Sequence, residues 1–513
     1  MANGQSGWAS LLKSEEWLAV WIGFLIIILS LVGMKVTLPS FKWVTGGEFN
    51  AYIGKVTPAV DRLATAAKDK GEAGLEAQAT ALKDAIAKKD RKAICDAAKK
   101  IEDGAKAVKD PALKKTAGDL SKEIKGNAGN VPGKVFSGSN LVSSIYIGVG
   151  LLILSIIAML LMGGTPIGAF IPGFIVVYII AWIAMFLAGN FTINEWGLEY
   201  VLWCLLFGLI VSNVIGVPAW LKPAVRTEFY IKTGLVILGS GILFKEILQA
   251  GAMGIIQALL VVSVIWYVCW WICKQFGVDD EFAAILSSAV SICGVSAAIA
   301  TSGAVKGDPK KLSYTTSIVL ICAVPMLVLQ PLIAKWVGMP DTVAGAWLGG
   351  TLDTSGSVVA AGELISQTAM KVGVIVKMSQ NVLIGVAAFI LAVIWTFKKT
   401  EVGPGADKPG LIEIWVRFPK FVLGFIIASI VFSFFLSPAT VGAVKGQLGG
   451  LRTIWFALAF TCIGLETNFG ELATLGGGRP AAAFLIAQGI NILWTLLLAY
   501  LFFGGYIFPM PQF

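Results

Sequence analysis

The sequence predicts an all-α polytopic membrane protein with about 11 transmembrane helices in an inverted repeat, two re-entrant or discontinuous helical segments, and a helical soluble insertion. Three observations lead to this prediction. Of the 513 residues, 57% are hydrophobic and only 14% are charged. Several apolar runs reach the roughly 20 residues that a helix needs to cross a bilayer. Two distant stretches of the chain also resemble one another, as the halves of many inverted-repeat membrane proteins do.

The apolar runs give the expected transmembrane helices. The first run lacks a small-residue cleavage site, so we expect a retained helix rather than a signal peptide. Two of the eleven runs, 230–243 and 451–468, are short for a span. The expected spans lie near 17–38, 143–163, 170–188, 199–217, 230–243, 253–274, 313–337, 370–396, 415–437, 451–468 and 480–508.

The apolar runs, the charged stretch between the first two of them and the internal repeat described below divide the chain into five expected parts. They are 1–40 (an N-terminal transmembrane helix), 41–138 (a soluble helical insertion), 139–196 (accessory transmembrane helices), 197–340 (a first transporter repeat) and 341–513 (a second transporter repeat). Leu75, Ala79, Leu82 and Ile86 recur in the insertion at helical spacing. We therefore expect amphipathic helices there, such as a helix hairpin that acts as a cap or oligomer contact.

The repeat is visible in one ungapped pair of stretches, 238–251 and 463–476. The alignment pairs Gly239 with Gly464, Phe244 with Phe469, Glu246 with Glu471 and Gly251 with Gly476. Both stretches follow the two short apolar runs. Inverted repeats pack around a central site near the bilayer midplane, so the pairing predicts the inverted-repeat secondary-transporter fold.

The distribution of basic loops predicts the topology. Lys and Arg in short loops gather on the cytoplasmic side of a membrane protein. The basic short loops here are 217–230, 304–312 and 396–420. All three fall on one side only if 282–304 and 341–363 enter and leave the membrane on the same face. We therefore expect two re-entrant segments, with the insertion outside the cytoplasm.

The two re-entrant segments hold small, polar residues at their expected bends. Free amides at a helix N-terminus attract anions, and small side chains let a ligand approach the backbone. We expect two opposed tips to form an anion pocket. The alternative is that these residues only allow close helix packing. The candidate substrate-binding residues are Cys293, Gly294, Val295, Ser296, Ala297, Thr354, Ser355, Gly356 and Ser357.

Charged and amide side chains within apolar segments give the candidate coupling site. A charge at the helix centre costs about 2.5–3.5 kcal/mol on insertion scales, so it tends to mark function. Lys377, with Gln380 nearby, could provide the counter-charge for an anion, or it could reach the nearer interface. Asp353 could bind H+ or Na+, or it could form a structural salt bridge with Lys377.

At these residues the chain resembles the sulfate exporter family of bacterial membrane proteins. The resemblance lies in the order and spacing of "CGVSA" (293–297), "VVAAG" (358–362) and Lys377, and it covers the chain from about residue 205 to the last span. It implies a carrier in the cation:proton antiporter and anion transporter group, with sulfate or a similar anion as substrate. Members of that family carry histidine and arginine where this chain has Asp353 and Gln380.

The residue inventory narrows the function. The chain has no histidine, which removes the commonest catalytic base and metal ligand, so we expect neither an enzyme nor a metal site. The prediction is a secondary active transporter of a small anion in the bacterial inner membrane, coupled to H+ or Na+ and needing no cofactor. The alternatives are a cation/proton antiporter of the same fold and an anion channel. The expected partners are the anion and the lipid bilayer, with a homodimer left open and nucleic acid excluded.

Overall fold

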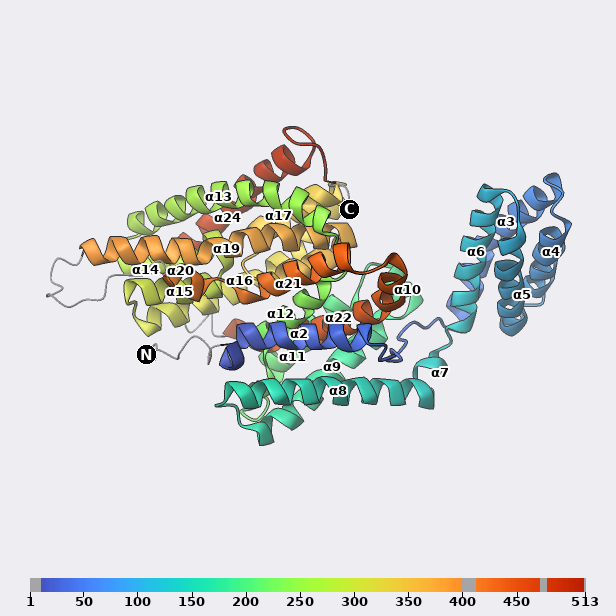
Figure 1. Cartoon of the computed structure of the whole chain (residues 1–513), viewed down its shortest axis with the longest axis horizontal. Coiled ribbons are helices and arrows are strands. Elements are labelled where there is room, and N and C mark those ends of the chain that lie inside the picture. Colours follow the sequence, from blue (N-terminus) through green and yellow to red (C-terminus); the bar gives the residue numbers. More distant parts are fainter. Residues whose placement is uncertain (1–10, 399–411, 471–477, 512–513) are drawn as a thin grey trace. The chain divides into compact units, whose positions relative to one another are not determined.

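The computed structural model describes residues 11–398, 412–470 and 478–511, shown in Figure 1. Within these ranges every named element is a helix, and the one β-bridge pairs Trp43 with Asn190. The chain forms two compact units. Unit 1 comprises Met1–Val36, Gly148–Trp182 and Val201–Phe513, and unit 2 comprises Thr37–Ile147 and Ile183–Tyr200.

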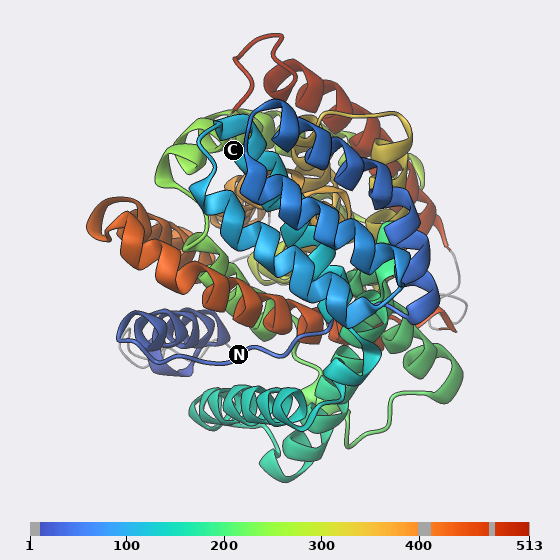
Figure 2. The same cartoon turned by 90° about the vertical axis from the view of Figure 1, so that its right-hand side faces the viewer.

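Unit 2 is built on four helices that lie side by side, drawn in blue in Figure 2. They are α3 (Gly46–Asp69), α4 (Ala73–Ala87), α5 (Arg91–Gly104) and α6 (Pro111–Gly129). The predicted apolar stripe packs into their core, where Leu75, Ala79 and Leu82 are buried and Ile86 is partly buried. The insertion thus folds as four helices rather than as a single hairpin.

Side chains cap the helices of unit 2 and hold its ends together. Thr45 and Glu48 form a capping box at the start of α3, and Asp110 caps α6 ahead of Pro111. Arg91 donates hydrogen bonds to four backbone carbonyls near the end of α6 and the start of α3, those of Val44, Asn127, Ala128 and Asn130. Unit 2 also includes η1 (Ala105–Ala107), α7 (Pro132–Val135) and α10 (Phe191–Glu195).

Seven helices among the described residues are long and apolar enough to cross a membrane. The first residues of α8 and the last residues of α9 belong to unit 2. In unit 1, α13 lies along both α19 and α24 (Figure 1). The seven are α8 (Gly138–Met162), α9 (Ile167–Ala188), α13 (Phe244–Gln275), α16 (Pro309–Trp336), α19 (Gln367–Lys398), α22 (Pro438–Glu466) and α24 (Arg479–Phe503).

The remaining expected spans form shorter helices. The helix α12, expected at 230–243, has only 13 residues, and all of them except Glu228 are buried within unit 1. The shorter elements of unit 1 are α2 (Glu15–Leu31), α11 (Tyr200–Ile210), η2 (Val211–Ile215), η3 (Lys222–Ala224), α12 (Thr227–Gly239), α14 (Asp280–Ser288), η4 (Ala289–Cys293), α15 (Val295–Val305), α17 (Asp341–Thr351), α18 (Ser355–Ile365), α20 (Ile412–Arg417), α21 (Lys420–Ile430) and η5 (Val431–Phe435).

The two stretches aligned by sequence have matching surroundings. A Cβ at Gly239 would lie 2.3 Å from the carbonyl oxygen of Phe425 in α21, and one at Gly464 would lie 2.5 Å from that of Leu205 in α11. Both α11 and α21 continue into a five-residue π-helix, η2 and η5.

The next aligned pair follows the same pattern. The amide of Phe244 donates to Ser433 in η5, and that of Phe469 donates to Asn213 in η2. The later pairs that involve Glu471 and Gly476 lie outside the described residues.

Candidate functional site

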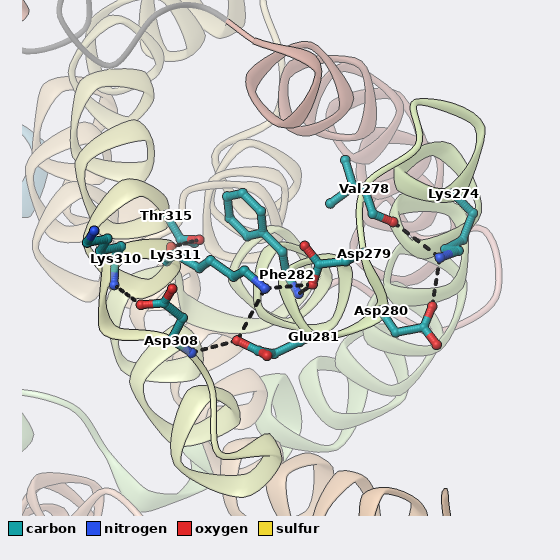
Figure 3. Close-up of polar contacts among 10 residues, drawn as sticks. All are labelled: Lys274, Val278, Asp279, Asp280, Glu281, Phe282, Asp308, Lys310, Lys311 and Thr315. Atoms are coloured by element: carbon teal, nitrogen blue, oxygen red, sulfur yellow. Dashed lines mark hydrogen bonds and ion pairs between the residues drawn. The ribbon is translucent and has the colours of Figure 1, made fainter. Parts of the chain in front are cut away.

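The first segment predicted to be re-entrant folds as a helical hairpin, formed by α14, η4 and α15. The open end of this hairpin, where α14 begins and α15 ends, contacts the start of α16. Lys311 of α16 forms ion pairs there with Asp279 (2.8 Å) and Glu281 (3.5 Å), as Figure 3 shows. The amide of Asp308, just after α15, donates to the carboxylate of Glu281. The start of α14 and the end of α15 therefore lie together, and the chain turns back at Gly294.

The second segment predicted to be re-entrant, α17 and α18, is a similar hairpin with its bend at residues 352–354. Gly345 in α17 packs on the backbone of Ala369, and Gly362 in α18 packs on that of Met370. Both open ends of this hairpin thus contact the first turn of α19.

The two hairpins approach from opposite directions along α19. The arm α15 of the first hairpin packs with Ile384 and Ala388, well beyond the Ala369 region that the second contacts. Their tips meet between these levels. Gly294 has φ of +55°, and a Cβ there would lie 2.6 Å from Val319 and 3.0 Å from the Cβ of Asp353. That these hairpins enter a bilayer stays a prediction.

Lys377 and Gln380 of α19 bind the carbonyl ends of both hairpins. The Lys377 ammonium donates to the carbonyl of Ile292 (2.7 Å) and to Oε1 of Gln380 (3.0 Å). The Gln380 amide donates to the carbonyls of Ser291 (3.0 Å) and Gly350 (3.2 Å). The last carbonyls of a helix carry its partial negative charge, so a buried cation is stabilised there. With 2% of its surface exposed, Lys377 does not reach an interface.

Asp353 lies at the meeting point without hydrogen bonds. It is 1% exposed, and no donor among the described residues reaches either carboxylate oxygen. Lys377 is close enough to interact with it electrostatically, but no ion pair joins the two within the described part of the chain. The structural salt bridge is therefore not formed. Gln488 of α24 lies beside Asp353, but its amide donates to the carbonyl of Thr351 (2.9 Å) and to Met326 (3.3 Å).

A cavity of about 320 Å³ adjoins the tips. Its lining includes Cys293, Val295 and Ser296 of the first hairpin and Thr354 and Ser355 of the second. The helices α15 and α18 both begin at this cavity, so their positive ends face it. Such a volume is at the lower end of the range for small-molecule sites.

Five of the nine predicted binding residues thus line the cavity, and the other four do not. Gly294, Ala297, Gly356 and Ser357 are absent from its wall. The space beside the two glycines is filled by protein: by Val319 and Asp353 at Gly294, and by Ile463 at 3.2 Å from a Cβ at Gly356. The expectation that these glycines leave room for a ligand is wrong. They allow the hairpins to pack.

Further residues of the wall were not predicted from the sequence. Asn381, next to Gln380, is 3% exposed, donates to Ser355 (3.1 Å), and has no partner for Oδ1 among the described groups. Arg417 also lines the cavity and donates to the carbonyl of Ala300. The sequence signal that could have identified Asn381 is its amide side chain, which lies near Lys377 in an otherwise apolar helix.

An ion cluster forms another part of the wall. Lys232 of α12 is 7% exposed and pairs with Glu16 (2.5 Å), Glu228 (3.3 Å) and Glu15 (3.7 Å). Lys232, Glu16 and Glu228 line the cavity. The helix α2 also packs closely on α12, because Gly23 lies against Val236. The N-terminal helix is thus part of unit 1 and contributes to the cavity.

Comparison with known proteins identifies relatives of the chain. Residues 172–483 match the family described as conserved hypothetical protein 698. A UPF0324 membrane protein of Rhodopirellula baltica is 42% identical over 352 residues, which are 67% of this chain and 64% of the relative. A UPF0324 membrane protein of Nitratidesulfovibrio vulgaris is 40% identical over 353 residues, 66% of this chain and 60% of the relative.

A more distant relative is nearly fully covered. The UPF0324 inner membrane protein YeiH of Salmonella typhimurium is 28% identical over 347 residues, 64% of this chain and 96% of the relative. The chain spans less than two thirds of the length of the Rhodopirellula and Nitratidesulfovibrio proteins. No solved structure matches the chain. Glu16 lies outside the matched residues, while both hairpins lie within them.

Proposed function

We propose that this chain, which belongs to the family described as conserved hypothetical protein 698, is a secondary active transporter of a small anion. Transport is by alternating access and is coupled to H+ or Na+. The observation on which this proposal rests is the meeting of two opposed hairpin tips at a cavity of about 320 Å³, with Lys377 behind them. Interrupted helices that meet in this way are the usual binding sites of secondary transporters.

The preference for an anion comes from the groups that face the cavity. The first-turn amides of a helix have no intrahelical acceptor, and here two helices begin at one cavity. Ser296 and Ser355 add hydroxyl groups to the wall, and Arg417 adds a cation. Sulfate or a related sulfur-containing anion is the suggested substrate, which rests on the family resemblance alone.

Alternating access would follow from the repeat. The cavity wall includes Ile299 and Ala300 of α15 and, from the basic loop 396–420 that we expect in the cytoplasm, Arg417 and Pro419. In an inverted repeat, exchange of the two halves' conformations opens the same site to the other face. The matched surroundings of Gly239 and Gly464 support such a repeat. We place the protein in the bacterial inner membrane as a multi-pass protein, in agreement with the name of its Salmonella relative.

A cation/proton antiporter of the same fold is the second candidate. The observation that favours it is the buried carboxylate of Asp353, which has no hydrogen-bond partner among the described residues. In that case the cavity would carry no anion, and exchange of sodium for protons would proceed without one.

Transport by purified protein in proteoliposomes separates these functions. We expect uptake of radiolabelled sulfite or sulfate that depends on a pH or sodium gradient, and that excess unlabelled anion suppresses. Empty liposomes control for leakage. If neither anion is taken up and a sodium gradient instead drives proton movement in anion-free buffer, the antiporter replaces the anion transporter.

A further inference from the structure

We infer that the coupling ion is a proton carried by Asp353, that Gln488 accepts the hydrogen bond of the protonated acid, and that proton and anion move in the same direction. This inference rests on the proposed transport function. Its evidence is two buried acceptor groups that both lack a hydrogen-bond donor. Asp353 has no donor at either oxygen, and Oε1 of Gln488 also has no partner within the described residues.

The orientation of the Gln488 amide is fixed by its other contacts. Its Nε2 donates to the carbonyl of Thr351, an atom that can only accept, so Oε1 must be the atom left over. Gln488 is 3% exposed, and its hydrogen bond to the carbonyl of Thr351, two residues before Asp353, holds its amide at the tip of the second hairpin. One proton on Asp353 supplies an O–H donor for Gln488 Oε1. It thereby neutralises a buried carboxylate that has no donor and gives Gln488 Oε1 a hydrogen-bond partner, and both changes remove the destabilising effect of an unpaired buried acceptor.

A sodium ion fits this place poorly. In transporters with interrupted helices, the coordinating oxygens come from unwound carbonyls and half-helix C-terminal ends. Here the Ile292 carbonyl is bound by Lys377, the Gly350 carbonyl by Gln380 and the Thr351 carbonyl by Gln488. The ammonium of Lys377 already provides a positive charge at this place, so a sodium ion would be a second cation there. The described side-chain oxygens without a hydrogen-bond partner at this site are the two of Asp353, Oε1 of Gln488 and, in the cavity wall, Oδ1 of Asn381.

The charge of the site then couples the proton to the anion. When a proton from water forms the O–H bond, the Asp353 side chain changes from −1 to 0, while Lys377 keeps its charge. Two thiols lie near this pair of charges, that of Cys322 in α16 near Asp353 and that of Cys293 in η4 near Lys377. The helix α24 presents the neutral amides of Gln488 and Asn491 there. Protonation leaves Lys377 without a counter-charge in a low-dielectric region, which favours binding of an anion. Loss of the proton restores the negative charge of Asp353, so the anion is released together with the proton.

Infrared difference spectroscopy between acidic and alkaline pH tests the proton site on the purified full-length protein without any substrate. A protonated buried carboxyl has a C=O stretching band that an amide or carboxylate lacks. We expect this band in the wild type, its loss in Asp353→Asn, and a shift to higher frequency in Gln488→Leu, where the hydrogen bond is absent. Asp341→Asn, at an exposed carboxylate, serves as the matched control and should keep the band.

The result that overturns the inference is a band as intense in Asp353→Asn as in the wild type, or one whose intensity changes when sodium replaces potassium at constant pH. Any band left by another buried carboxyl, such as that of Glu363, is common to both proteins and cancels in this comparison. The Gln488→Leu shift keeps the test decisive if Asp353→Asn fails to fold. In proteoliposomes, uptake of sulfite or sulfate should acidify the interior, and alkalinisation would contradict the shared direction. A band assigned to Asp353 without anion uptake leaves the proton site standing and removes the proposed substrate class. Anion uptake without the band leaves the proposed substrate class standing and removes the proton site.

Discussion

Gly294 and Asp353 touch where the two hairpins meet, since a Cβ at Gly294 would lie 3.0 Å from the Cβ of Asp353. The contact brings residues 59 positions apart in the sequence into one site. It also explains why glycine stands at 294, because the backbone there has φ of +55° and Val319 fills the remaining space. The cavity and the buried charges are arranged around this contact.

Replacement of Gly294 should therefore destabilise the fold. We expect Gly294→Ala to cost about 1–3 kcal/mol through backbone strain and overpacking. The measurement is the melting temperature of purified protein in detergent. Gly489→Ala is the matched control, because a Cβ at Gly489 meets nothing within 4 Å. Equal melting temperatures for Gly294→Ala and the wild type would contradict the tight contact.

Lys377 should be needed for anion binding. Lys377→Ala removes the fixed positive charge and leaves the Ile292 carbonyl unpaired. We expect binding of sulfite or sulfate, measured by calorimetry, to weaken at least about tenfold, which corresponds to ~1.4 kcal/mol. Lys371→Ala, on the same helix and paired with Glu246 instead, is the control. Comparable affinity in the two variants would remove Lys377 from the site.

Arg91 should hold unit 2 together. Arg91→Ala leaves four backbone carbonyls without this donor and removes the guanidinium from the ring of Phe49, 4.5 Å away. We expect a loss of at least about 2 kcal/mol in the stability of unit 2, because hydrogen bonds from charged groups contribute more than neutral ones. Hydrogen exchange of peptides from 46–129 measures this loss. The exposed Arg62→Ala should leave exchange unchanged.

Glu48 should make unit 2 sensitive to acid. Although burial opposes ionisation, hydrogen bonds from Thr192, Thr45 and Asn190 lower the pKa of Glu48 from 4.5 to about 2. A lowered pKa contributes stability above the unfolded value of 4.5, and this contribution is lost as the pH falls towards 2.

The pH effect can be measured by hydrogen exchange against a matched variant. At each pH, exchange in α3 of the wild type is compared with that of Glu48→Gln. The protection advantage of the wild type should shrink between pH 5 and pH 2, because only an ionised Glu48 provides it. Glu76→Gln, in α4, should show no such trend. A constant difference between wild type and Glu48→Gln over this range would exclude the role of the charge.

Hydropathy and charge patterns predicted much of the fold. Long apolar runs correspond to helices such as α13 and α19, and the stripe through Leu75 and Leu82 lies in the core of unit 2. The four-helix form of unit 2 was not predicted, because a stretch rich in Lys and Ala gives few sequence signals for where one helix ends and the next begins. The helix α12 is short and buried at every residue except Glu228, a property that depends on its neighbours rather than on its own hydropathy.

The site was predicted only in part, for a physical reason. Small polar residues in an apolar segment indicated both tips, and Lys377 and Asp353 were identified by the cost of burying a charge. Sequence alone could not say whether Gly294 faces a ligand or a neighbouring helix, because both uses require a missing side chain. The cluster of Glu16, Glu228 and Lys232 was missed, since the pair of Lys232 with Glu16 joins α12 to α2, a helix far away in the chain.

Anion binding by a matched pair of variants at Ser296 tests the central claim most directly. Ser296 is exposed to the cavity at the start of α15, so substitutions there should not disturb packing. Ser296→Asp puts a negative charge at the proposed anion site, whereas Ser296→Asn has nearly the same shape and no charge. Calorimetric titration with sulfite and with sulfate should show binding to the wild type and to Ser296→Asn, and at least about tenfold weaker binding to Ser296→Asp. Equal binding by the two variants would contradict an anion site between the hairpin tips.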